Sequence, residues 1–207
     1  MAWETYESTL TSPSIVHEVS TSRAGLGKGK VYPASAAGHL LNPLRFLIQP
    51  PSRIVNRVAL GPSDLVLELG CGPGWFSRSI SSAIPRGHLV LCDVQPAMLR
   101  MAVGRIHHVE SACAVTADAC DLPFVDETFD AIVMSSVLGE VPDRVRCLRE
   151  LRRVLTDSGS ITVVETRRDS DFIPLTEIGD LATQAGLVIS RTWGWKWEFT
   201  ARLTARK

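Results

Sequence analysis

"LELGCGPGW", Leu67 to Trp75, carries the clearest signal of fold class in this 207-residue chain. Aliphatic residues carrying a single acid, Glu68, give way to glycines at alternate positions, Gly70, Gly72 and Gly74. An apolar strand followed by glycines and a helix start is typical of the first turn of an open parallel sheet, where a ligand lies beyond the carboxyl end of the strand. The stretch therefore predicts a ligand site at this turn.

The same turn indicates the charge of its ligand. A dinucleotide fingerprint, G-x-G-x-x-G, would need a third glycine where Trp75 stands, and no Gly-Lys-Ser/Thr follows as a phosphate-binding P-loop requires. Glu68, two residues before the first glycine, would repel a pyrophosphate and suits a positively charged group. The alternative is that Glu68 is a chance acid on a strand and the glycines only make a tight turn.

The composition bounds the class of protein. A hydrophobic content of 45% in 207 residues suffices for one well-packed domain. Basic and acidic residues both number 22, so no overall charge favours nucleic acid or an anionic membrane as a partner. The five cysteines lack CxxC spacing, so we expect reduced thiols, a cytoplasmic protein and no metal site. No run approaches the roughly 18 apolar residues of a membrane span, and no export signal is visible at the start.

Downstream of Gly61, short apolar runs alternate with helix-like stretches, which predicts a mostly parallel sheet covered by helices on both faces. We expect strands at 64–69, 88–93, 112–117, 129–135, 160–166, 187–193 and 197–205. We expect helices near 74–84, 96–107, 142–155 and 174–185. No helix separates the last two strands, so these form an antiparallel pair.

The first 60 residues differ from the rest in composition and in hydrophobic pattern. Residues 1 to about 35 are rich in Ser, Thr, Gly and Lys, and the following helical pattern is interrupted by Pro43, Pro50 and Pro51. We expect an arm and a lid of short helices at 1–60, and a Rossmann-like domain at 61–207.

Two further acids follow predicted strands. Asp93 ends the second strand, 23 positions after Gly70, close to the spacing at which Rossmann-type folds place an acid on ribose hydroxyls. The alternative is that Asp93 only begins the turn before the next helix. Asp118 follows the third strand and could accept a hydrogen bond from an exocyclic amine, with Val94 and Met98 flanking the ring or belonging to the core.

The stretch from Asp64 to Glu165, about half the chain, resembles the class I S-adenosylmethionine-dependent methyltransferases. The resemblance rests on "VLELGCGPG", on Asp93, on "ADACDLPF", on "FDAIVMSSVLGEVPD" and on "LRELRRVLTDSGSITVVE". It implies a doubly wound, mostly parallel seven-stranded sheet with an antiparallel last strand, beneath an N-terminal helical cap. It also implies S-adenosylmethionine as cofactor and S-adenosylhomocysteine as product.

Carried over residue by residue, the resemblance assigns the cofactor contacts. Around the methionine portion and the methyl group it implies Glu68, Gly70, Gly72, Gly74, Ser135 and Ser136. It implies Asp93 at the ribose, and Asp118 and Ala119 at the adenine. Relatives often read "LkPGG" where this chain has "LTDSGS", Leu155 to Ser160. We expect that turn to persist with altered geometry and without loss of cofactor binding.

Methyl transfer from a sulfonium needs alignment more than reactive side chains, so few catalytic candidates arise. Glu140 and His39 are candidate general bases. The more ordinary interpretation makes Glu140 a first-turn acid of the helix beginning near Pro142, and His39 a surface or packing residue. Tyr32, Asn42 and Arg45 are candidate lid or substrate residues.

Two clusters have ordinary explanations. Trp193, Trp195 and Trp197 would face one way on an extended segment, and packing beneath the terminal strand pair is favoured over an aromatic wall for an acceptor. The arginines of "RVRCLRELRRVL" suit a solvated helix face with salt bridges to Asp143 and Glu150.

The leading functional hypothesis is an enzyme that transfers a methyl group from S-adenosylmethionine to an N, O or S atom of a small molecule, with no nucleic acid partner. The alternatives are a methyltransferase acting on a lipid or macromolecule, and an inactive S-adenosylmethionine-binding partner subunit. The sequence leaves the acceptor, the pathway and the oligomeric state open.

Overall fold

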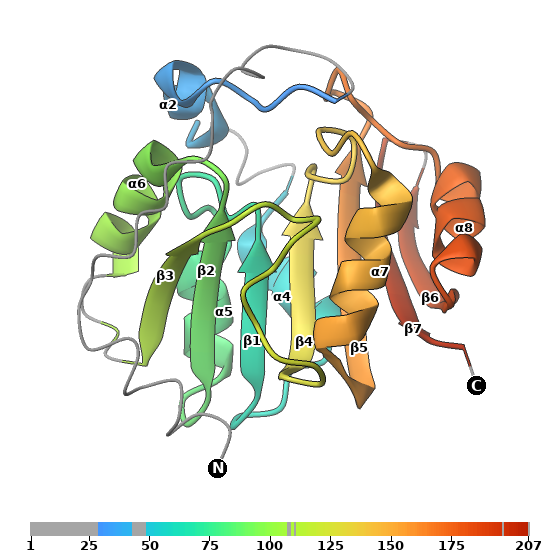
Figure 1. The fold of residues 1–207 in the computed structure, drawn as a ribbon. Helices are drawn as coiled ribbons and strands as arrows, with labels where there is room; N and C mark the ends of the chain where they lie inside the picture. Colours follow the sequence, from blue (N-terminus) through green and yellow to red (C-terminus); the bar gives the residue numbers. More distant parts are fainter. Residues whose placement is uncertain (1–28, 43–48, 107–108, 110, 196, 207) are drawn as a thin grey trace.

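A seven-stranded sheet forms the centre of the computed structural model, which describes residues 29–42, 49–106, 109, 111–195 and 197–206 (Figure 1). The strand order is β3-β2-β1-β4-β5-β7-β6. The strands are β1 (Leu65–Leu69), β2 (His88–Asp93), β3 (Ala112–Thr116), β4 (Phe129–Ser135), β5 (Leu155–Thr166), β6 (Leu187–Trp195) and β7 (Glu198–Ala205). Neighbours among β1 to β5 pair in parallel. This arrangement confirms the predicted doubly wound fold.

Helices cover both faces of the sheet because successive strand residues point to opposite sides. Val66, Leu91 and Val133 pack in the core cluster that contains α4, α5 and α6, whereas Leu67 and Ile132 pack in the cluster that contains α7 and α8. These helices are α4 (Pro51–Val58), α5 (Ser77–Ala83), α6 (Pro96–Ile106), α7 (Arg144–Val154) and α8 (Leu175–Gln184). Apolar runs such as that of β2 are buried on both sides for this reason.

The last strand, β7, is inserted between β5 and β6 and runs antiparallel to both. The predicted antiparallel pair is therefore confirmed. All five parallel strands end at the same edge of the sheet, the upper edge in Figure 1. That edge is where a doubly wound sheet binds its ligand.

Several element starts differ from the sequence-based prediction, such as that of α5, which begins at Ser77 rather than near residue 74; two other differences have a local cause. The fifth strand begins at Leu155 rather than near residue 160. Its pairing with β4 advances from Phe129–Leu155 to Ala131–Ser160, so the "LTDSGS" stretch, expected to be a turn, is a register irregularity inside β5. The helix predicted from residue 142 begins at Arg144, because the Asp143 carboxylate accepts a hydrogen bond from the Arg146 N–H and caps it.

The charges of α7 are paired much as predicted. Arg153 forms ion pairs with Glu150 and with Asp126. Asp143, expected to form a salt bridge, serves instead as the helix cap. The arginine-rich face of α7 is thus largely explained by local contacts.

The prediction that the tryptophans pack beneath the terminal strands is wrong for two of them. Trp195 is 75% exposed and Trp197 is 60% exposed, at the turn that joins β6 to β7. Only Trp193 is half-buried, and the guanidinium groups of Arg191 and Arg202 lie over its ring.

The N-terminal segment contributes a 3₁₀ turn, Ala34–Ala36, and the short helix α2 (Ala37–Leu40). Figure 1 shows this segment crossing above the upper edge of the sheet. It is joined to the loop after β4 by a hydrogen bond from the Gly29 N–H to the Gly139 carbonyl, 2.8 Å long. The proposed division of the chain at residue 60 stays a prediction. No helix in the described ranges is long and apolar enough to cross a membrane.

Candidate functional site

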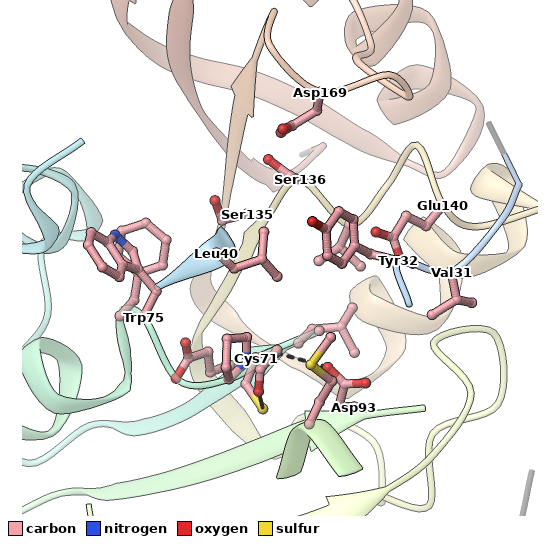
Figure 2. A pocket seen from close by; sticks show the side chains of 18 of the residues that line it. Val31, Tyr32, Leu40, Cys71, Trp75, Asp93, Ser135, Ser136, Glu140 and Asp169 are labelled. Atoms are coloured by element: carbon pink, nitrogen blue, oxygen red, sulfur yellow. Dashed lines mark hydrogen bonds between the residues drawn. The ribbon is translucent and has the colours of Figure 1, made fainter. Parts of the chain in front are cut away.

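A cavity of about 710 Å³ lies at the carboxyl ends of β1, β2, β4 and β5, beneath the N-terminal segment (Figure 2). Most of the residues singled out from the sequence line it. They are Tyr32, His39, Asn42, Glu68, Gly70, Gly72, Asp93, Val94, Met98, Ala119, Ser135, Ser136 and Glu140. The predicted residues thus come together at the predicted edge of the sheet.

Three predicted residues lie elsewhere. Gly74 packs against Ala102 of α6 and does not line the cavity. Asp118 also lies outside the lining, where its carboxylate accepts a hydrogen bond from the Cys120 N–H. Arg45 falls outside the described residues. The proposed cofactor contacts of Gly74 and Asp118 stay predictions.

The glycine turn after β1 presents its main chain directly to the cavity. Gly70 and Gly72 both have positive φ, 61° and 53°, which side-chain-bearing residues rarely adopt. A Cβ on Gly70 would lie 2.3 Å from Cγ2 of Val137, whereas a Cβ on Gly72 would meet no atom of the described residues within 4 Å, its two chain neighbours aside. Gly70 therefore permits close packing of two loops, and Gly72 leaves space open for a guest.

Glu68 carries a buried carboxyl group at the end of β1. The residue is 3% exposed, and Oε2 has no hydrogen-bond partner among the described residues. Burial raises the pKa of Glu68 to about 8; the Ser77 hydroxyl opposes the rise, and the nearby charge of Asp93 adds to it. A cationic donor in the cavity would satisfy this oxygen and favour the ionised form.

Asp93 holds the other side of the glycine turn. Its Oδ2 accepts a hydrogen bond from the Gly72 N–H and its Oδ1 accepts one from the Gln95 N–H, both 2.9 Å long. Burial raises the pKa of Asp93 to about 6, while these backbone donors oppose the rise. Since a carboxylate has about four acceptor positions, it retains capacity for ligand hydroxyls.

Two neighbouring serines face the cavity from the end of β4. Within the described chain, the buried hydroxyl oxygens of Ser135 and Ser136 have no hydrogen-bond partner. Ser136 has a φ of 55°, and its N–H donates to the Val164 carbonyl at 2.9 Å. Buried hydroxyls without partners indicate a polar guest.

Glu140 lines the cavity instead of beginning a helix, so the interpretation as a first-turn acid is wrong. Its Oε2 accepts a hydrogen bond from the Tyr32 backbone N–H at 3.2 Å. Burial raises the pKa of Glu140 to about 8, and Asp171, Asp93 and Asp169 add to the rise. The role of Glu140 as a general base stays a prediction.

The Tyr32 backbone bridges two loops over the cavity. Its N–H is held by Glu140, and its carbonyl accepts a hydrogen bond from Nε2 of Gln95 at 2.8 Å. We call these two contacts the Tyr32 strap. His39 is exposed on α2 and lines the cavity, but its role as a base stays a prediction.

Several lining residues were not singled out from the sequence. Gln95 lies two positions after Asp93, the proposed ribose-binding acid, and that proximity could have predicted its place in the cavity lining. Asp169 and Asp171 belong to the short loop after β5, which approaches the cavity only because β5 and β4 are paired. Their composition alone gave no signal.

Sequence comparison supports a methyltransferase. Residues 66–159 match a family model described as a methyltransferase domain. The ubiquinone/menaquinone biosynthesis C-methyltransferase UbiE of Vibrio vulnificus is 33% identical over 129 residues, which cover 58% of this chain and 47% of that protein. The demethylmenaquinone methyltransferase of Staphylococcus aureus is 30% identical over 115 residues, covering 55% and 48%. The chain spans about half the length of these curated relatives.

Solved structures share the fold at lower identity. A SAM-dependent methyltransferase from Aquifex aeolicus matches with a TM-score of 0.78 and 20% identity, over 84% of this chain and 98% of that one. An O-methyltransferase of neocarzinostatin biosynthesis, solved with S-adenosyl-L-homocysteine and 1,4-dihydroxy-2-naphthoic acid, matches with a TM-score of 0.67 and 21% identity, over 83% and 58%. The sequence match over residues 66–159 and the fold agree, and the chain is similar to S-adenosylmethionine-dependent methyltransferases.

Proposed function

We propose that this protein transfers a methyl group from S-adenosylmethionine to a small-molecule acceptor. The observation that carries the proposal is the pair of buried carboxyl groups, Glu68 and Asp93, on either side of the open turn at Gly72. A phosphate-bearing cofactor would be repelled there. S-adenosylmethionine carries an ammonium, a sulfonium and a ribose, and no phosphate.

The residues present fit this cofactor. Oε2 of Glu68 is a buried acceptor without a partner among the described residues, which suits an ammonium group. Asp93 would hold the ribose hydroxyls, and Val94, Met98 and Ala119 would flank the adenine from the β2 and β3 side of the cavity. When bound, the cofactor supplies an electrophilic methyl group on a sulfonium.

The chain's own contribution is alignment and shelter. Ser135 and Ser136 at the end of β4 would position polar groups beside the methyl donor. The Tyr32 strap would act as part of a lid that excludes water and fixes the Glu140 carboxylate. In this proposal residues 1–60 form the lid and residues 61–207 the cofactor-binding domain.

The acceptor atom is proposed to be N, O or S. A carbon acceptor is the second candidate, because the named curated relatives include C-methyltransferases of quinone biosynthesis. A cytoplasmic location also stays a proposal, supported by five cysteines without a disulfide among them.

Calorimetry on Glu68→Gln tests the cofactor site. We expect S-adenosylmethionine and S-adenosylhomocysteine to bind the wild-type protein, and the variant to bind them about 10- to 100-fold more weakly, since a hydrogen bond to a charged group contributes roughly 1.5–3 kcal/mol. Asp157→Asn is the matched control, because Asp157 is 80% exposed and paired with Arg152.

Two results would contradict the proposal. One is binding of NADH in place of the sulfonium nucleoside. The other is that S-adenosylmethionine and S-adenosylhomocysteine both bind, but no tested acceptor leads to turnover of S-adenosylmethionine into S-adenosylhomocysteine. That result would favour the inactive partner subunit. Transfer of a radiolabelled methyl group to an extracted product measures the second outcome.

A further inference from the structure

The terminal hairpin of β6 and β7 presents arginine and tryptophan side chains on one face. Residues directly opposite each other in an antiparallel pair share a face of the sheet. The pairs on this face are Arg191 with Arg202, Trp193 with Thr200 and Trp195 with Glu198. Arg191 and Trp195 are exposed. The guanidinium groups of Arg191 and Arg202 lie 5.2 and 5.1 Å from the centroid of the Trp193 ring. Basic and aromatic groups are therefore interleaved along the hairpin.

Helix α4 continues this face beside β7. The Arg202 guanidinium donates a hydrogen bond to the Arg57 carbonyl, and the Arg57 guanidinium donates one to Oγ1 of Thr200 at 2.9 Å. Arg53 lies one turn before Arg57, so both side chains project from the same side of α4, and Arg53 is exposed. The helix thereby adds a second row of arginines next to the hairpin.

The charge of this face is positive. Its three elements, α4, β6 and β7, contain the arginines Arg53, Arg57, Arg191 and Arg202 and a single acid, Glu198. Glu198 is paired with Arg57 across 4.0 Å. Within the described chain, no ion pair involves Arg53, Arg191 or Arg202. These guanidinium groups therefore attract an anionic partner from outside the chain.

The tip of the hairpin exposes two indole rings. Trp195 is 75% exposed and Trp197 is 60% exposed. Each also takes part in other interactions within the chain, and these fractions are the surface that remains open. Gly194, with a φ of 93°, permits the tight turn, since a Cβ there would lie 2.3 Å from the Glu198 carbonyl oxygen. Large aromatic side chains held outward at a tight turn indicate contact with another surface.

The hairpin tip lies beside the cavity. Both β5 and β6 are antiparallel to β7, so β6 ends at the same edge of the sheet as β5, the upper edge in Figure 1. The Trp197 carbonyl accepts hydrogen bonds from the Arg167 N–H at 2.9 Å and from Oγ1 of Thr166 at 3.3 Å. Thr166 and Arg168 line the cavity, and Arg168 is exposed. The cavity therefore reaches the surface next to the tip.

The chemistry of the face favours a lipid bilayer over other partners. Tryptophan is enriched where a membrane meets water, and arginine is attracted to anionic headgroups. Nucleic-acid bases would need open ring faces for stacking, but guanidinium groups already lie over Trp193. A two-fold contact with a second copy of this chain would bring the arginines of the face together. An anionic membrane surface suits both the rings and the charges.

We infer that this face is a membrane-docking surface, which binds a bilayer that contains anionic lipids. It is formed by Arg53, Arg191, Arg202, Trp193, Trp195 and Trp197. The guanidinium groups contact the headgroups, and the two indole rings of the tip lie at the boundary between headgroups and acyl chains. Docking on this side brings the cavity opening at Arg168 to the bilayer, so a molecule dissolved in the membrane can reach it. The docking itself needs neither cofactor nor acceptor and goes beyond the proposed function.

Vesicle co-sedimentation of the full-length protein measures docking directly. One set of vesicles is phosphatidylcholine alone, and the other is equimolar phosphatidylcholine and phosphatidylglycerol. We expect tighter binding to the anionic set than to the neutral set, and a loss of this difference at high ionic strength, because salt screens the arginines. Brominated acyl chains in the vesicles should quench tryptophan fluorescence, because the indole rings of the tip reach the start of the chains.

The double variant Trp195→Ser with Trp197→Ser tests the tip. We expect it to bind anionic vesicles at least about 10-fold more weakly and to lose the quenching by brominated chains. Val125→Ser is the matched control, because it removes an apolar side chain that is 65% exposed on the loop between β3 and β4. This control should bind vesicles as the wild type does.

The double variant Arg53→Gln with Arg191→Gln tests the charge. Each neutralised arginine should weaken binding to anionic vesicles about 5-fold, and binding to neutral vesicles should not change. Arg100→Gln removes an exposed arginine of α6, a helix that packs on β2 and β3, and should leave binding to both sets unchanged. Thermal unfolding at the wild-type temperature in every variant distinguishes a lost contact from a lost fold.

Four results would overturn the docking surface. They are no binding to either set of vesicles, equal binding by the wild type and the double tryptophan variant, tighter binding to a single-stranded oligonucleotide than to vesicles, and self-association of the wild type that the tryptophan variant abolishes in sedimentation velocity. None of these affects the proposed function, which fails instead if neither S-adenosylmethionine nor S-adenosylhomocysteine binds.

Discussion

At the scale of single residues, Gly70 and Gly72 show how one turn meets two separate demands. Both need a positive φ, so both lose conformational strain by lacking a Cβ. Only Gly70 is also enclosed, because Val137 from the loop after β4 occupies the space that a side chain would need. The structural and the ligand-facing glycine are therefore distinguishable by mutation.

Alanine substitutions test that distinction. We expect Gly72→Ala to lower the free energy of unfolding by about 1–2 kcal/mol through backbone strain alone. Gly70→Ala should lower it by about 1–3 kcal/mol more, because Val137 must also shift. Urea denaturation at one pH measures both losses. Equal losses would show that the contact with Val137 is relieved without cost.

Residue-level reasoning from the sequence reached the cofactor side of the cavity better than the acceptor side. Glu68 and Asp93 follow predicted strands directly, so their position at the sheet edge follows from topology. Asp169 and Tyr32 reach the same cavity through loop paths that no periodicity encodes. Glu140 was ambiguous because an acid near a helix start has an ordinary explanation, and only its distance from the cap at Asp143 resolves it.

At the scale of elements, β5 carries a buried acid, Glu165, whose contribution to the free energy of unfolding depends on pH. Glu165 is 1% exposed, and its Oε2 accepts a hydrogen bond from the Ile173 N–H. Burial raises the pKa of Glu165 from 4.5 to about 8, and Asp171 and Asp169 add to the rise. The folded state thus binds a proton that the unfolded chain has already released above pH 4.5.

The sign of the effect follows from proton linkage. Because the pKa is raised on folding, the contribution of Glu165 is fully present below about pH 4.5 and is lost as pH rises through about 8. One such group lowers the free energy of unfolding by up to about 1.4 kcal/mol per pH unit in that window. Glu165→Gln keeps an acceptor for the Ile173 N–H and cannot ionise. We expect the variant to gain stability relative to wild type between pH 5 and pH 8, as measured by chemical denaturation at both values.

A matched control isolates the effect of burial in this measurement. Asp157→Asn removes an acid that is 80% exposed, so its stability difference from wild type should vary little over the same pH range. A pH-independent difference for Glu165→Gln as well would mean that Glu165 ionises normally in the folded protein.

The elements themselves were largely predictable because apolar runs and helical periods are local signals. The bounds of β2 and β4 agree with the prediction, and those of β1 differ by one residue. The early start of β5 was not predictable, because the pairing with β4 skips from Leu155 to Ser160 and the apolar pattern does not encode this register irregularity. The exposed tryptophans likewise depend on how the β6–β7 hairpin projects, which its alternating pattern does not encode.

At the scale of the whole molecule, the cavity lies at one edge of the sheet, and helices pack on both of its faces. Ligand binding should therefore stabilise the protein as a unit and protect that edge most. At a concentration of 100 times Kd, S-adenosylhomocysteine should add about 2.7 kcal/mol to the free energy of unfolding. Hydrogen exchange should slow in the turns after β1 and β2 and in residues 29–42 more than in the outer strand β6. Uniform slowing across the sheet would contradict a site confined to the carboxyl edge.

The Tyr32 strap has a consequence for how such proteins diverge. Both of its contacts with the loops below use main-chain groups of residue 32, an N–H and a carbonyl, rather than its phenol ring. Any amino acid except proline can supply that pair, since proline alone lacks the N–H. The amino-acid sequence of the covering segment can therefore diverge while its backbone conformation is retained. This agrees with a family match that begins only at residue 66. Homologues that share this closure should be recognised by superposition where their alignments have already lost similarity.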